Sequence, residues 1–328
     1  MKDEVINFYT VDKIKKYLPK INDEQEEYTG MKLFKHILIC GATGAGKSNC
    51  FMNYLKRVSE GNGTYKHIYI CYKTPGEPFY QFLENNLKKD EVSFYKSVND
   101  FPNVEDFSDQ INEKPIKGMK KEKDKEKDKY LVIFDDCVND KDKKALSKIE
   151  KYFTYARKKF ITLMFLTQSY FDTSTFIRKQ VSYVILCSIR GKRDLNLICK
   201  DFSFGIDSED LMKLYKEATT KSNDDDMPFF KINTMECPLN KKFSRNFLAY
   251  FEIDKTKNEP IEEGKGCSAS KIRDASEESH IRRRQRTRQL RRMLNDISVV
   301  PEAQAVVIQP PEIPLAPVEI LRIPERTN

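Results

Sequence analysis

The sequence predicts an α/β fold with a mostly parallel central sheet flanked by helices, followed by a basic, proline-rich tail. Short apolar runs with strand character alternate with helix-like segments, which is typical of a parallel sheet covered on both faces. A glycine-rich turn joins one of these runs to a helix after residue 40, and another run ends in two carboxylates, Asp135 and Asp136. Parallel sheets bind ligands at the carboxyl ends of their strands, so both features point to one functional edge.

The glycine-rich turn reads GATGAGKSN and matches G-x-x-x-x-G-K-[ST] at every fixed position. This predicts a phosphate-binding P-loop on a RecA-like NTPase fold, in which backbone N–H groups and a helix N-terminus wrap a triphosphate. Lys47 is expected to reach the β- and γ-phosphates and Ser48 to ligate Mg²⁺, so ATP and Mg²⁺ are the expected cofactors. The residues expected to bind nucleotide are Gly41, Ala42, Thr43, Gly44, Ala45, Gly46, Lys47, Ser48 and Asn49.

The two carboxylates follow the apolar run 131–134. We expect Asp135 to hold Mg²⁺, directly or through water, and Asp136 to accept a proton from the attacking water or to orient it. The alternative is that two acids simply end a strand before a loop. This arrangement also requires the acidic segment and the P-loop to meet at adjacent strand ends.

The later apolar run 160–168 ends in Thr167 and Gln168. If its strand lies beside the acidic one, Gln168 would sit next to the γ-phosphate and position water or sense hydrolysis. Arg157 and Arg178 both stand near expected strand edges, and an arginine supplied across a subunit boundary can stabilise the transition state. For either arginine, an ordinary surface position is the alternative.

The remaining elements follow from periodicity and from glycine and proline punctuation. Residues 223–226 are acidic, but a loop between helix and strand explains them better than a metal site. The helices are expected at 11–17, 47–58, 79–87, 141–158, 173–179, 194–200 and 208–218, and the further strands at 67–72, 92–95, 183–187, 229–232 and 247–251.

Composition divides the chain into an N-terminal segment 1–32, an ATPase domain 33–251 with a charged insertion at 113–129, and a largely unfolded tail 252–328. The net charge of +8 is uneven, because the segment 281–292 contains seven arginines and no acid. That segment could bind nucleic acid, with strong salt dependence, or act as a nuclear address, a dock for an acidic protein or a solvated tail.

The eight cysteines are scattered and form no C-x-x-C pair, which indicates reduced, buried thiols in an intracellular protein. With three histidines in the chain, a dedicated Cys/His zinc site is not expected. No signal peptide or integral membrane segment is expected either, since no apolar run approaches the ~20 residues needed to span a bilayer. We therefore expect a cytoplasmic, virion-associated or nuclear location.

Together, GATGAGKSN, LVIFDD, FLTQS and FIRKQ, in this order, resemble the FtsK–HerA branch of P-loop ATPases. The likeness covers residues 33–200 and is closest to the genome-packaging ATPases of large double-stranded DNA viruses and virophages. It implies a homo-oligomeric ring, usually a hexamer, that drives double-stranded DNA into a capsid, with capsid or portal-vertex proteins as partners. It also implies that Lys47, Asp136, Gln168 and the trans finger Arg178 are catalytic. Many relatives carry Glu at the place of Asp136, whose shorter side chain would need a bridging water or a shift.

The sequence thus favours an ATP-driven DNA translocase that packages a viral genome. One rival is a nucleotide-binding switch, although residues 240–243 (NKKF) lack the acid of the guanine-recognising N-K-x-D. Another is a non-catalytic assembly protein that docks on a capsid or coat. A terminase that also cuts DNA is disfavoured, because no strand-borne acidic cluster follows Thr219.

Overall fold

The protein is represented by a computed structural model, which describes residues 7, 25–60, 65–73, 76–107, 128–137, 142–223 and 225–253. These residues form one nine-stranded sheet in the order β3-β2-β4-β5-β1-β6-β7-β8-β9. Strands β1 to β6 pair in parallel, and β7, β8 and β9 continue the sheet in antiparallel pairs. The expected α/β class with a mostly parallel sheet is therefore confirmed. The strands are β1 (His36–Cys40), β2 (His67–Tyr72), β3 (Val92–Tyr95), β4 (Tyr130–Asp135), β5 (Ile161–Thr167), β6 (Tyr183–Leu186), β7 (Phe230–Asn233), β8 (Phe243–Arg245) and β9 (Ala249–Tyr250).

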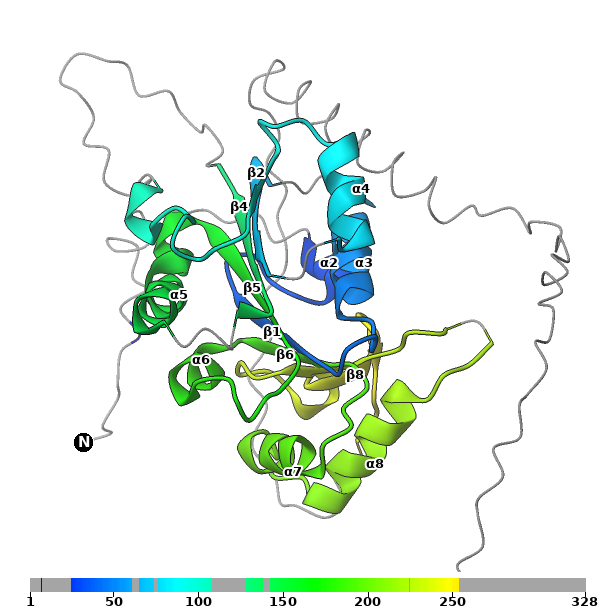
Figure 1. Ribbon diagram of the computed structural model, residues 1–328. Helices are drawn as coiled ribbons and strands as arrows, with labels where there is room; N and C mark the ends of the chain where they lie inside the picture. Colours follow the sequence, from blue (N-terminus) through cyan, green and yellow to red (C-terminus); the bar gives the residue numbers. More distant parts are fainter. Residues whose placement is uncertain are drawn as a thin grey trace, which may run out of the picture.

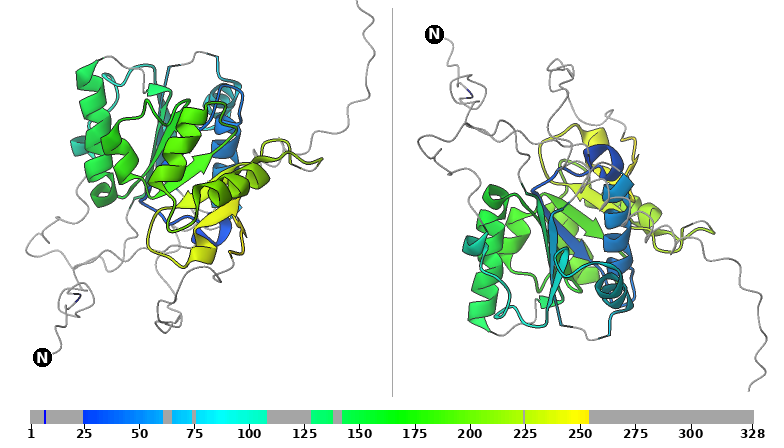
Figure 2. Two further views of the ribbon diagram at one scale, coloured as in Figure 1. Left: turned by 90° about the horizontal axis from the view of Figure 1, so that it is seen from below. Right: turned by 90° about the horizontal axis from the view of Figure 1, so that it is seen from above.

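Helices cover both faces of this sheet (Figures 1 and 2). Helices α3 and α4 lie on one face, while α5 and α6 lie on the other (Figure 1). The helices are α2 (Gln25–Thr29), α3 (Lys47–Glu60), α4 (Pro78–Asn86), α5 (Lys143–Tyr155), α6 (Thr175–Gln180), α7 (Lys192–Asp201) and α8 (Ser208–Thr219), with 3₁₀ turns η2 (Val104–Asp106), η4 (Ala156–Lys159) and η5 (Leu239–Lys241).

Two large apolar cores result, one on each face, because successive strand residues point to opposite sides. Ile37 and Ile39 of β1 pack into the core beneath α3 and α4, whereas Leu38 and Cys40 pack into the core beneath α5. All five residues of β1 are buried, as expected for a central strand covered on both faces. The central strands are thus packed against apolar side chains on both faces.

Side-chain caps fix where two of the helices begin. The carboxylate of Asp142 accepts a hydrogen bond from Lys144 N at 2.8 Å at the start of α5. The hydroxyl of Ser174 accepts one from Ile177 N at 3.3 Å at the start of α6. Such caps satisfy N–H groups that the first helical turn leaves unpaired.

The antiparallel extension differs in detail from expectation. Strand β7 overlaps the expected run 229–232, but the run 247–251 contributes only the two-residue strand β9, and β8 was not anticipated. The expected helix at 11–17, most of the charged insertion and the tail from residue 254 onward lie outside the described residues.

A buried lysine ties the start of the described chain to this extension. Lys231 of β7 is 1% exposed, and its ammonium donates to the carbonyl oxygens of Gly30 (3.4 Å), Thr29 (3.5 Å) and Phe247. It also lies 5.0 Å from the centre of the Tyr250 ring. Burial lowers the pKa of Lys231 to about 7.

The described cysteines are free thiols, and all of them except Cys237 are buried. Within the described part of the chain, no helix has both the length and the apolar character required to cross a bilayer.

Candidate active site

The P-loop runs from the end of β1 to the start of α3, as the motif predicts. Gly44 and Gly46 have φ angles of +74° and +94°, a region that side chains disfavour. Gly41 is required for a different reason, since a Cβ there would lie 2.7 Å from Cys187 Cβ. Gly41 N donates to Thr167 O and Ala42 N donates to Ser188 O, each at 3.1 Å. The loop is therefore fixed between the ends of β5 and β6.

The lysine of the motif folds back over this loop. Lys47 Nζ donates to Gly41 O at 2.9 Å and to Ala42 O at 3.4 Å. Ser48 and Asn49 follow in the first turn of α3, where both side chains are partly buried. The loop, its ammonium and a helix N-terminus thus converge as an anion site requires.

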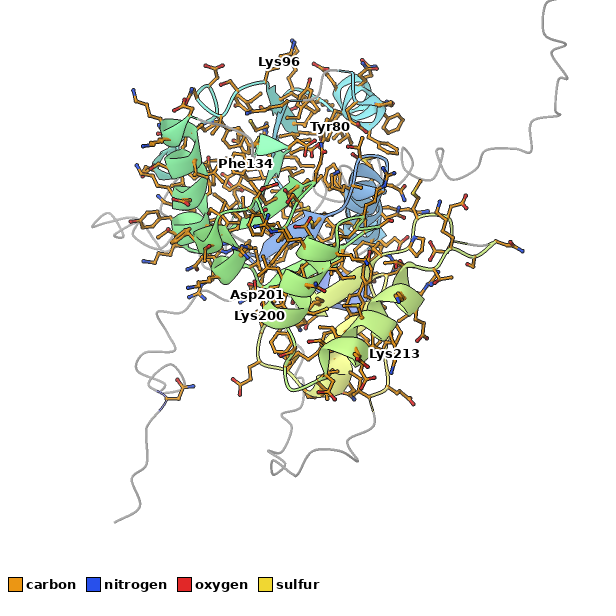
Figure 3. All side chains as sticks on the ribbon, turned by 60° about the horizontal axis from the view of Figure 1, so that its bottom comes forward. Tyr80, Lys96, Phe134, Lys200, Asp201 and Lys213 are labelled. Carbon is orange, nitrogen blue, oxygen red and sulfur yellow. The ribbon has the colours of Figure 1, made fainter. Side chains whose placement is uncertain are left out.

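Asp135 ends β4 and is 8% exposed. Tyr80 of α4 donates its hydroxyl to Asp135 Oδ2 at 2.7 Å, and Figure 3 shows Tyr80 beside the sheet. Burial raises the pKa of Asp135 to about 6, and the neighbouring Asp136 adds to the rise. The Tyr80 hydrogen bond and the positive charge of Lys47 oppose it. The charge of Lys47 therefore acts directly on the ionisation of Asp135.

Asp136 is linked to the P-loop through Gln168. Its backbone has a φ of +53°, and its N–H donates to Leu166 O at 3.1 Å. Gln168 Nε2 donates to Asp136 Oδ2 at 2.6 Å, and Gln168 Oε1 accepts from the Thr43 hydroxyl at 3.1 Å. The structure thus brings Thr43, Gln168 and Asp136 into one chain of hydrogen bonds.

The order of the strands corrects one expectation. The P-loop strand β1 and the acidic strand β4 are not neighbours, because β5 lies between them and pairs with both. The expected neighbour of β4 is present, however: β5 places Gln168 beside Asp136. The P-loop and the two acids consequently meet across one intervening strand rather than at adjacent strand ends.

The residues present fit a divalent cation. Two consecutive carboxylates, one of them buried, lie within electrostatic reach of each other and raise the cost of ionising both. A cation between Asp135 and Ser48 would neutralise this charge with the oxygen ligands that Mg²⁺ prefers. The described residues contain no group of three or more His, Cys, Asp or Glu side chains with metal-site geometry.

Neither candidate arginine faces this set of residues within the subunit. Arg178 of α6 pairs with Asp201 at 3.4 Å and lies 5.1 Å from the centre of the Tyr170 ring, with its side chain 14% exposed. Figure 3 shows Asp201 and Tyr80 in separate parts of the molecule. Arg157 is exposed in η4, at the amino end of β5 and hence at the opposite edge of the sheet.

The acidic loop at residues 223–226 is bound to the protein itself. Asp225 Oδ2 accepts from Arg245 Nη2 at 3.1 Å and from Asn246 Nδ2 at 2.7 Å. The loop interpretation accounts for this acid.

Two residues that contact the candidate site were not identified from the sequence. Tyr80 lies on a separate helix 55 residues before Asp135, and no motif marks it. Met227 packs on the P-loop, with its sulfur 3.1 Å from the position that a Cβ on Gly46 would take. Its only sequence signal is its place directly after the acidic loop.

A family model described as "Poxvirus A32 protein" matches residues 26–226. Comparison with curated proteins finds no match. Among solved structures, the chain resembles the genome packaging NTPase B204 of Sulfolobus turreted icosahedral virus 2 bound to ATP-gammaS, with 18% identity and a TM-score of 0.41, covering 66% of this chain and 98% of that one. It also resembles EssC (ATPases 2 and 3) of Geobacillus thermodenitrificans, with 10% identity and a TM-score of 0.40, covering 85% of this chain and 47% of that one.

Proposed function

We propose, from the premise that the chain belongs to the Poxvirus A32 protein family, that it is a viral genome-packaging ATPase which moves double-stranded DNA into a capsid. The family match agrees with the FtsK–HerA resemblance of the motifs. The observation that carries the proposal is the convergence of the P-loop, Asp135, Asp136 and Gln168 at the carboxyl ends of β1, β4 and β5.

The site supports hydrolysis of the terminal phosphoanhydride bond. The P-loop N–H groups and Lys47 would hold the phosphates, while Ser48 and Asp135 would hold Mg²⁺, which supplies charge neutralisation when bound. Asp136 would take the proton of the attacking water, whose oxygen bonds to the γ-phosphorus as the bond to the bridging oxygen of ADP breaks.

Gln168 is placed to orient that water. Its amide is shared between Thr43 and Asp136. A γ-phosphate beside Thr43 would compete for the Thr43 hydroxyl, so Gln168 could report whether the phosphate is present. The P-loop and the catalytic carboxylate are thereby coupled.

The site is completed, in this proposal, by Arg178 of a neighbouring subunit in a ring, with a hexamer favoured. Arg178 pairs with Asp201 of its own chain, and its buried Nε has no hydrogen-bond partner among the described residues. To act in trans it must exchange Asp201 for a phosphate of the neighbour. Arg157 is the weaker candidate, because it stands at the amino edge of the sheet.

Double-stranded DNA and capsid or portal-vertex proteins are the proposed partners. The seven arginines of residues 281–292, outside the described residues, would add a salt-dependent contact to DNA phosphates. We place the activity in the cytoplasm or viral factory of the infected cell, or on the virion.

The test is ATPase activity measured with and without double-stranded DNA. Wild type should hydrolyse ATP faster when DNA is present, and Lys47→Ala should lower the rate by about a hundredfold or more. Lys213→Ala, an exposed lysine of α8 that pairs with Asp210, is the matched control and should retain the wild-type rate. Activity that is insensitive to both DNA and Lys47→Ala would refute the proposal.

Two further measurements separate the rivals. A nucleotide-binding switch would bind nucleotide tightly with negligible turnover. A non-catalytic assembly protein would also bind nucleotide with negligible turnover, and adding DNA would change neither property. Negative-stain images with an ATP analogue and DNA should show closed rings for a motor.

A further inference from the structure

The loop that precedes β7 is hydrogen-bonded to β8 and the turn after it, yet it leaves an apolar side chain exposed beside the P-loop. Met227 is 39% exposed and packs on the backbone of Gly46. The apolar side chain of Met227 therefore lies next to the phosphate-binding loop and is only partly covered by the described residues.

The attachment of this loop is extensive for a surface segment. Before Met227, Asp225 binds Arg245 and Asn246, and Arg245 Nη1 also donates to the carbonyl oxygens of Glu217 (3.0 Å) and Thr220 (2.9 Å) at the end of α8. After Met227, Phe229 N donates to Asn246 Oδ1 at 3.1 Å. Met227 therefore lies between two segments that are each hydrogen-bonded to Asn246, and its side chain contacts Gly46.

The sheet order indicates which end of a nucleotide would lie at Met227. The acids of β4 and Gln168 after β5 stand on one side of β1, whereas β6 and β7 stand on the other. The γ-phosphate must face the acids, so the β- and α-phosphates follow along the P-loop at increasing distance from the acids. The nucleoside then emerges on the β6–β7 side, where Met227 is found.

We propose that Met227 is a binding residue for the nucleobase of the nucleotide, which it contacts through its thioether against the flat face of the ring. This inference rests on the proposed nucleotide site and extends it from the phosphates to the base. A thioether makes favourable contacts with aromatic rings but cannot read their hydrogen-bonding edges. Met227 should therefore strengthen ATP and GTP binding by the same factor.

Calorimetric titration of the full chain with ATP, and separately with inorganic tripolyphosphate, tests this assignment. Met227→Ala should weaken ATP binding by about five- to tenfold, while the affinity for tripolyphosphate, which has no base, stays within about twofold. Met227→Leu should retain most of the ATP affinity. Leu248→Ala is the matched control, since Leu248 is 40% exposed and should leave both affinities unchanged.

Equal weakening of ATP and tripolyphosphate would overturn the proposal, because Met227 would then only shape the P-loop. Unchanged ATP affinity in Met227→Ala would overturn it as well. If the proposed function is wrong, wild type would bind ATP without hydrolysing it. Comparing the affinities for ATP and tripolyphosphate would still test the role of Met227.

Discussion

Replacing Asp135 by Asn should stabilise the nucleotide-free protein at neutral pH. The carboxyl is 8% exposed, and burial raises its pKa from 3.8 to about 6. Each unit of pKa corresponds to about 1.4 kcal/mol, so keeping this group ionised costs the folded state about 3 kcal/mol. An amide avoids that cost, and its oxygen can still accept the Tyr80 hydroxyl. After allowing for burial of the amide, we expect a gain of about 2 kcal/mol.

The sign of the pH dependence follows from the same shift. Between pH 3.8 and about 6 the folded state binds more protons at Asp135 than the unfolded state does, so this group's contribution to stability falls as pH rises through that window. The advantage of Asp135→Asn should therefore be full well above pH 6 and small near pH 4, where the carboxyl is protonated in the folded state and close to half protonated in the unfolded state.

Urea denaturation of the full chain at pH 4 and pH 7.5, without nucleotide, measures this difference. Asp136→Asn is the matched control, since the neighbouring carboxyl is partly exposed and should change stability much less. Mg²⁺ with ATP should stabilise both proteins through the P-loop, and wild type more than Asp135→Asn, which has lost a metal ligand. An Asp135→Asn variant no more stable than wild type at pH 7.5, or equally favoured at both pH values, would refute the reasoning.

Three other substitutions test separate parts of the structure. Tyr80→Phe should cost about 1–3 kcal/mol in urea denaturation and raise the Mg²⁺ concentration needed for half-maximal ATPase activity, because Asp135 loses its donor. Gly41→Ala should lower stability by about 1–3 kcal/mol because its Cβ meets Cys187, whereas Gly44→Ala, in open space at positive φ, should cost about 1 kcal/mol; thermal denaturation compares the two. Wild-type stability should rise between pH 7 and 10 through the lowered pKa of Lys231, and Lys231→Met should remove that rise in denaturation at the two pH values.

What the sequence could predict were features defined over short distances in the chain. The P-loop is one such feature, because its glycines, lysine and serine lie within eight residues of each other. The ends of β4 and β5 are others, since a buried run followed by polar residues marks a strand end without knowledge of its neighbours. Strand β3, for example, has the bounds expected from its β-prone run alone.

The features that could not be predicted depend on contacts between distant segments. Nothing local to β1 or β4 reveals that β5 inserts between them, because each strand is apolar on both faces and would pair with any parallel neighbour. The bond from Tyr80 to Asp135 joins two elements through the fold rather than through a spacing. The same holds for Met227, which reaches Gly46 only because β7 extends the sheet beyond β6.

The position of β1 in the sheet separates the site into two functional sides. In the proposed mechanism, Gln168 and Asp136 would act on the γ-phosphate from the β5 side, whereas the loop carrying Met227 would face the nucleoside from the β6 side. Substitutions on the first side should therefore lower kcat with little effect on ATP affinity, and those on the second should change affinity with little effect on kcat. Gly41 N and Ala42 N bond to the ends of β5 and β6 respectively, so the P-loop contacts both sides of the site.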